Sequence, residues 1–155
     1  MVANRSAPPG PIVPTLIYAD VAGAVAWLSA AFGFRERLRW GSADSFTAEL
    51  EVGSGSMFVS GPHVGHESNT GVAFVPPRAN ELSHSLMVQV DDVDRHHDRA
   101  KAKGAVIVGD LATYPFGERQ YSVHDLEGHL WTFTQSVSDV DPVDWGATVA
   151  GTDER

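Results

Sequence analysis

The alternation of apolar and polar positions predicts a strand, a helix and three further strands in the first part of the chain. Residues 12–19 are apolar and β-prone, which indicates a buried strand. Asp20 then stands where a helix N-cap belongs, and Gly33 stands where a helix ends. Between them, apolar residues recur at helical spacing at Val21, Val25, Leu28 and Phe32. Short turns of Gly, Ser and Asp separate the strand-like runs at residues 34–40, 45–52 and 56–60.

The same pattern returns in the second half of the chain. Asp92 aligns on Asp20 at a separation of 72 residues, and residues 86–93 resemble residues 16–21. At this separation the apolar helix positions fall on Val93, His97, Ala100 and Gly104. Three strands are again expected, at residues 106–111, 118–124 and 129–135. The chain is therefore predicted to contain two β-α-β-β-β modules.

Composition sets the boundaries of these modules. Residues 1–11 are rich in Pro, Gly and Ala and are expected to form a flexible arm. Module one is expected at residues 12–62 and module two at residues 83–135. The linker between them, residues 63–82, has the length of a functional loop or a connection between modules. Residues 136–155 are polar, acidic and rich in turn formers, and are expected to form a C-terminal tail.

The closing segment, residues 116–135, carries the most specific motif. Its residues follow the pattern Gly-Glu-Arg-x-Tyr-x-Val-x-Asp-x-x-Gly-His-x-Trp, which indicates two strands around a tight turn. Together with the two strand-Asp-Val-helix starts, this hairpin resembles the vicinal oxygen chelate superfamily, which includes glyoxalase I, bleomycin-resistance proteins and extradiol dioxygenases. The resemblance implies an α+β, glyoxalase-like fold. Two modules with curved mixed sheets would enclose a small-molecule cavity, within one chain or across a dimer.

Enzymes of that superfamily hold a divalent metal, with His and Glu or Asp ligands from the first and last strand of each module. The resemblance places these positions at Val13, Val59, Ser85 and Thr132. Valine has no donor atom, and hydroxyls are poor ligands without carboxylate or imidazole partners. The sequence therefore predicts no metal cofactor. The alternative is Zn, Ni, Mn or Fe at other ligands, such as His84, which lies one residue from an expected position.

Strand alternation gives the residues expected on the cavity face. They are Val13, Thr15 and Ile17 in the first strand, Met57 and Val59 in the fourth, Ser85, Met87 and Gln89 in the fifth, and Leu130, Thr132 and Thr134 in the last. Aromatic side chains near this face would add stacking surfaces. The predicted ligand-binding residues are Trp40, Phe46, Met57, Met87, Gln89, Phe116, Arg119, Tyr121 and Thr132. For Arg119 two partners stay open, a ligand carboxylate or a nearby acidic side chain.

Other polar residues have structural interpretations. His97 falls at a core-facing helix position and His129 follows the turn glycine, so both are expected to pack rather than to catalyse. Asp92 and Asp125 are expected to form a helix cap and a turn. The sequence contains no recognisable motif for a nucleophile, and catalytic residues stay unassigned.

Composition and charge narrow the function classes. Hydrophobic residues make up 43% and charged residues 20%, which is enough for a normal core. The net charge of −9 disfavours nucleic acid as a partner, and no apolar run approaches the length of a membrane span. The chain has no cysteine, which excludes disulfides and thiolate metal sites. Because the N-terminus lacks the apolar core of a signal peptide, a cytoplasmic location is expected.

Two functions remain. The first is a metal-free binding protein, similar to the bleomycin-resistance branch, that sequesters a drug-like or metabolite ligand as a homodimer. The net charge of −9 suits a cationic ligand. The alternative is a glyoxalase- or dioxygenase-type enzyme, a lyase, isomerase or dioxygenase, which acts on a small organic substrate with a divalent metal. The unsuitable residues at the ligand positions favour binding.

Overall fold

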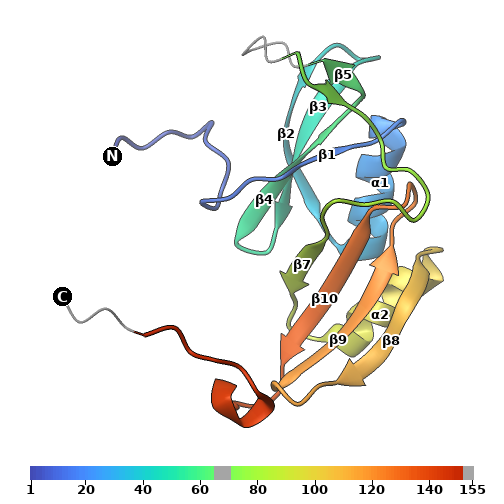
Figure 1. Cartoon of the computed structure of the whole chain (residues 1–155). Helices are drawn as coiled ribbons and strands as arrows, with labels where there is room; N and C mark the ends of the chain where they lie inside the picture. The colour runs from blue at the N-terminus through green and yellow to red at the C-terminus, as the bar shows by residue number, and fades with distance from the viewer. Residues whose placement is uncertain (65–70, 152–155) are drawn as a thin grey trace.

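The computed structural model describes residues 1–64 and 71–151 and contains two similar modules, one above the other in Figure 1. Module one contains β1 (Thr15–Ile17), α1 (Val21–Phe32), β2 (Arg35–Gly41), β3 (Phe46–Val52) and β4 (Gly55–Ser60). Module two contains β7 (Leu86–Gln89), α2 (Val93–Ala102), β8 (Val106–Thr113), β9 (Glu118–His124) and β10 (Leu130–Ser136). The remaining elements are β5 (His63–Val64), β6 (Ala73–Phe74) and η1 (Pro142–Trp145). Part of the predicted linker, residues 65–70, lies outside the described residues.

The two sheets have the same topology. Their strand orders are β1-β4-β3-β2 and β7-β10-β9-β8. In each sheet the first strand pairs in parallel with the last, and the other neighbours pair antiparallel. One helix covers one face of each sheet (Figure 1). This architecture confirms the predicted α+β fold of two β-α-β-β-β modules.

Both helices begin at the predicted caps. Asp20 accepts a hydrogen bond from the backbone N–H of Gly23 at 2.9 Å, and Asp92 accepts one from the N–H of Arg95 at 3.0 Å. Gly33 ends α1 with φ of 76°, a left-handed conformation that glycine adopts without steric cost. The first strand is shorter than expected, with proline before it at residues 11 and 14, since proline cannot donate to a sheet. None of the helices in the described part of the chain is long and apolar enough to span a membrane.

One hydrophobic core runs through both modules. The helix-facing sides of the two sheets contribute to it, and α1 contacts α2. Phe32, at the end of α1, contacts Phe34 of its own module, with ring centroids 5.6 Å apart. Its ring also lies 5.6 Å from Trp131 and 4.7 Å from Phe133, which both belong to module two. The two modules therefore share one core.

Buried hydrogen bonds join the modules at the β9–β10 turn. Asp125, which is 5% exposed, accepts from the Tyr18 hydroxyl at 2.6 Å and from the indole N–H of Trp131 at 3.0 Å. It also accepts from two backbone N–H groups of its own turn. Burial, and next the charge of Asp125, raises the pKa of Tyr18 well above its ordinary value. His129 donates from Nε2 to the carbonyl of Ile17 at 2.8 Å, so the structural interpretations of Asp125 and His129 hold.

Candidate functional site

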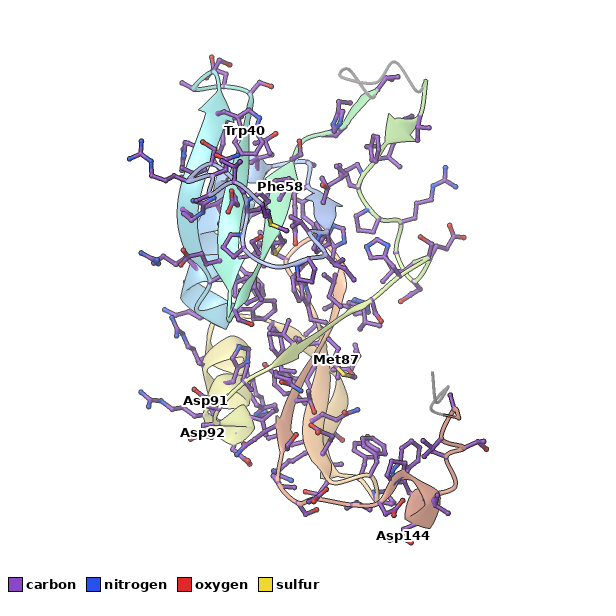
Figure 2. All side chains as sticks on the ribbon, turned by 90° about the vertical axis from the view of Figure 1, so that its left-hand side faces the viewer. Trp40, Phe58, Met87, Asp91, Asp92 and Asp144 are labelled. Atoms are coloured by element: carbon purple, nitrogen blue, oxygen red, sulfur yellow. The ribbon has the colours of Figure 1, made fainter. Side chains whose placement is uncertain are left out.

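Each sheet has a face opposite its helix, which we call the open face. On the open face of module one, Trp40 of β2 and Phe58 of β4 meet edge to face, with centroids 5.4 Å apart and planes at 89° (Figure 2). Their neighbours Ala48 and Val59 are buried in the core, so alternation turns this aromatic pair away from α1. Trp40 is 47% exposed and offers its ring as a stacking surface.

The open face of module two is lined by neutral polar groups. Met87 of β7 is 65% exposed and pairs with Thr132, whose hydroxyl lies 2.9 Å from that of Ser122. Gln89 is exposed on the same strand. Gln120 follows on β9, and its buried Oε1 has no hydrogen-bond partner among the described residues. The exposed amide of Gln89, next to these hydroxyls, is suited to hydrogen-bond an uncharged ligand.

Glu118 brings one negative charge to the end of this polar row. Its carboxylate accepts hydrogen bonds from Thr134 at 2.6 Å and from Ser136 at 2.5 Å. The hydroxyl of Ser136, and next that of Thr134, lowers the pKa of Glu118. The carboxylate is therefore engaged within the protein.

The structure places four of the nine predicted ligand-binding residues on the open faces and the others elsewhere. Those on the open faces are Trp40, Met87, Gln89 and Thr132. Met57 and Tyr121 are each 1% exposed and belong to the core. Phe46 also packs against the core, and the guanidinium of Arg39 lies 4.2 Å above its ring. These three side chains lie on the helix side of their sheets.

The expected orientation of β4 is therefore wrong by one residue. The prediction placed Val59 on the cavity face as the counterpart of Thr132. In the sheets Thr15 lies opposite Phe58, and its counterpart Met87 lies opposite Thr132. Phe58, not Val59, thus corresponds to Thr132. Because side chains alternate along a strand, a slip of one residue moved Met57 and Val59 to the wrong face.

Arg119 and Phe116 are engaged away from the open faces. Arg119 forms a bidentate ion pair with Asp94 of α2, with N···O distances of 2.8 and 2.7 Å. Of the two partners that the sequence left open, the structure therefore shows an acidic side chain. Hydrogen bonding to Asp94 raises the pKa of Arg119. Phe116 stacks on Tyr114 at 5.3 Å and meets Trp145 of the tail at 5.6 Å. Phe116 thereby anchors the tail to module two.

Both histidines of α2 pack against Tyr121, as expected for His97, and the second one is His96. Its ring lies 4.0 Å from that of Phe133, and its Nδ1 lies 2.7 Å from the hydroxyl of Tyr121. Burial lowers the pKa of His96 to about 4, and burial raises the pKa of Tyr121. His97 is half-buried at the edge of the same Tyr121 ring. His96 therefore stays neutral near pH 7.

We expect the stability of the protein to fall between pH 6.5 and pH 4 because of His96. In that range the unfolded chain binds a proton at this histidine and the folded chain does not, so acid favours unfolding. After allowance for partial exposure, the loss is about 2 kcal/mol. Denaturant unfolding at pH 7 and pH 4.5 measures it. The difference between the two pH values should shrink by this amount in His96→Gln, and an unchanged difference would contradict the assignment.

An ion pair that the sequence analysis did not single out lies on the open face of module one. Glu49 of β3 is 1% exposed, and Arg37 of β2 binds it through Nε at 2.7 Å and through its second amino group at 3.0 Å. The register of β2 shifts between Glu36 and Leu38, so the irregularity turns Arg37 toward Glu49. The hydrogen bond to Glu49 raises the pKa of Arg37. Alternating Arg on β2 opposite Glu on β3 was the available sequence signal.

The sequence profile of the Glyoxalase/Bleomycin resistance protein/Dioxygenase superfamily matches residues 11–133. The chain belongs to this superfamily. The predicted resemblance is thereby confirmed, and the match covers both modules. No curated protein matches the chain.

Solved structures of the superfamily share the fold. TioX from Micromonospora sp. ML1 is 38% identical, with 82% of this chain and 99% of that chain covered and a TM-score of 0.63. A glyoxalase/bleomycin resistance protein/dioxygenase from Nocardioides is 21% identical, with coverages of 89% and 91% and a TM-score of 0.60. The fosfomycin resistance protein FosX from Listeria monocytogenes, complexed with Mn(II) and sulfate, is 18% identical, with coverages of 81% and 91% and a TM-score of 0.57.

The residues of this superfamily member do not fit a divalent metal at the usual strand positions. With the corrected register these positions hold Val13, Phe58, Ser85 and Thr132. Two of them have no donor atom, and hydroxyls alone bind such ions weakly. Over residues 1–64 and 71–151 there is no cluster of three or more His, Cys, Asp or Glu side chains that could hold a metal. The ring centroids of His84 and His129 lie 6.4 Å apart, and Nε2 of His129 is hydrogen-bonded to the backbone carbonyl of Ile17.

Proposed function

We propose that the protein binds a small planar organic molecule without a metal, between the open face of module one in one chain and the open face of module two in a second copy. The observation that carries the proposal is the contact of the exposed Trp40 ring with Phe58, because Phe58 occupies the strand position that corresponds to Thr132, an expected metal-ligand position of module two. An aromatic ring at that position replaces metal coordination with stacking. Sequestration of a drug-like or metabolite ligand is the function that this arrangement supports best.

The chemistry of the two open faces defines the class of ligand. Module one offers aromatic surface, which favours a flat and partly apolar molecule. Module two offers the amide of Gln89 and the hydroxyls of Ser122 and Thr132, which favour uncharged polar groups on that molecule. A pocket with one apolar wall and a few hydrogen-bonding groups on the other is typical of small-molecule sites.

A homodimer would bring these two walls together. On or beside the open faces, Trp40 is 47%, Met87 65% and Val106 59% exposed. Large apolar side chains in such positions favour burial by a ligand or a second protein chain. With two copies related by a twofold axis, each module one would face a module two and form two equivalent sites.

We expect Trp40→Ala to weaken the binding of proflavine, a planar cationic dye, about tenfold, since it removes the most exposed stacking surface of the site. Fluorescence titration measures the affinity, and native mass spectrometry gives the number of chains and dye molecules in the complex. Trp145→Ala is the matched control, because Trp145 is 44% exposed but packs on Phe116 in the tail. Its affinity should equal that of the unmodified protein.

Equal proflavine affinity in Trp40→Ala would contradict the proposed site. A complex that contains one chain and one dye would contradict the shared site between two copies. Isothermal titration with Mn(II) or Zn(II) tests the metal-free proposal separately. One metal bound per site in competition with proflavine would favour the enzymatic alternative.

A further inference from the structure

The N-terminal arm, residues 1–11, crosses the open-face side of module one before the chain enters β1 (Figure 1). Two residues of the sheet hold it there. Arg37 donates to the backbone carbonyls of Arg5 at 2.9 Å and Ala7 at 3.0 Å. Ser56 of β4 donates from its hydroxyl to the carbonyl of Pro9 at 2.7 Å. The arm is therefore bound by side chains of the face on which the proposed ligand lies.

The backbone conformation of the arm fits its position on module one. The Asn4 side chain accepts from the N–H of Ser6, and the carbonyl of Asn4 accepts from the N–H of Ala7 at 3.1 Å, which makes a turn. Further along, Gly10 has φ of 93°, and a Cβ atom there would lie 3.3 Å from the Cα of Gly55. Glycine is thus required for the close approach of the arm to the β3–β4 turn.

The ion pair with Glu49 holds the Arg37 side chain in place independently of the arm. The inner edge of Arg37 is held by the carboxylate of Glu49, which is 1% exposed, while the arginine side chain keeps 21% exposure. A buried carboxylate is costly unless it is paired, so the guanidinium is confined to this place. The planar fork then directs its remaining N–H groups away from the sheet, where they meet the arm. Since Glu49 already balances its charge, this outer edge suits neutral carbonyl oxygens better than a second carboxylate.

We propose that Arg37 and Ser56 form a carbonyl-binding subsite of the ligand cavity, and that residues 5–9 of the arm are its internal occupant, which a ligand with neutral carbonyl groups displaces. The inference rests on the proposed function, because it names a part of the same site. The arm carbonyls mimic the ligand carbonyls in this arrangement. Displacement of the arm opens the floor of module one beside the aromatic pair.

The first experiment follows the arm without any ligand. Trypsin cleaves after Arg5 only when the arm leaves its seat, and mass spectrometry detects the loss of residues 1–5. We expect Ser56→Ala to accelerate this cleavage about fivefold, because one hydrogen bond to the arm is lost. The double variant Arg37→Gln with Glu49→Gln should accelerate it further, and it avoids an unpaired buried charge. Equal cleavage rates in all three proteins would overturn the internal-occupant assignment.

The second experiment measures the ligand class. Deletion of residues 2–9 is expected to strengthen the binding of 2-naphthamide about tenfold, and the gain for 2-naphthoate should be smaller. In the double variant, which keeps Ser56 and a donating side-chain amide at position 37, the deletion should bring a smaller gain for the amide. Loss of 2-naphthamide affinity on deletion would mean that the arm builds the site, and an equal or larger gain for the carboxylate would overturn the ligand class. Proflavine binding through Trp40 tests the proposed function independently, so either proposal can fail alone.

Discussion

Replacement of Asp125 with alanine is expected to lower the free energy of unfolding by about 4 kcal/mol. The carboxylate is 5% exposed and accepts four hydrogen bonds, from the Tyr18 hydroxyl, the indole of Trp131 and two backbone N–H groups. Alanine leaves these donors buried without an acceptor and opens a space at the junction of the modules. Denaturant unfolding monitored by Trp fluorescence measures the loss.

Two further variants serve as controls for the Asp125→Ala measurement. Asp125→Asn keeps one acceptor oxygen and the volume of the side chain, so its cost should be about half as large. Asp110→Ala removes an acidic side chain that is exposed on β8, and its effect should stay within about 0.5 kcal/mol. A loss below about 1 kcal/mol for Asp125→Ala would contradict the role of this residue as the connection between modules.

Phe32→Ala is expected to cost about 4 kcal/mol as well, for a different reason. The ring is 4% exposed and contacts aromatic rings from both modules, so its removal leaves a cavity in the shared core. Phe32→Leu retains most of the buried area and should cost about 1.5 kcal/mol or less. The same unfolding experiment measures both variants.

The shape of the unfolding transition of Phe32→Ala shows whether the two modules unfold together. Because one core spans the modules, we expect a single cooperative transition in the variant and in the unmodified protein. Two separate transitions would contradict the shared core. Separate transitions would also mean that the two open faces can move relative to each other. The proposed binding site does not require such movement.

Local signals in the sequence predicted much of the fold. The capping aspartates Asp20 and Asp92 stand before both helices, and their side chains make the expected hydrogen bonds. Gly33 ends α1 in the left-handed conformation that glycine favours. Such features depend on residues three or four positions apart, which is why they can be read along the chain. The closing hairpin motif also identified the superfamily correctly.

The candidate site was harder to predict, because it depends on register and on distant partners. One residue of error in β4 exchanged Phe58 for Val59 and moved Met57 to the wrong face. The partner of Arg119 lies on α2, 25 residues away, and sequence alone left two choices for it. The binding of the arm by Arg37 joins residues about 30 positions apart. No local pattern encodes contacts of this kind.

The sequence by itself determined the helices and strands of the two modules, since apolar periodicity, caps and turns act over a few residues, and the resemblance to the superfamily implied their fold. The resemblance also placed residues with poor or absent donors at the expected metal positions, one of which the strand register moves from Val59 to Phe58. Only the tertiary structure decided which side chains share the open faces, such as Trp40 with Phe58, and which acids and arginines pair. The reason is physical: strand pairing fixes the face of every side chain at once, and that pairing forms only when the modules pack on their common core.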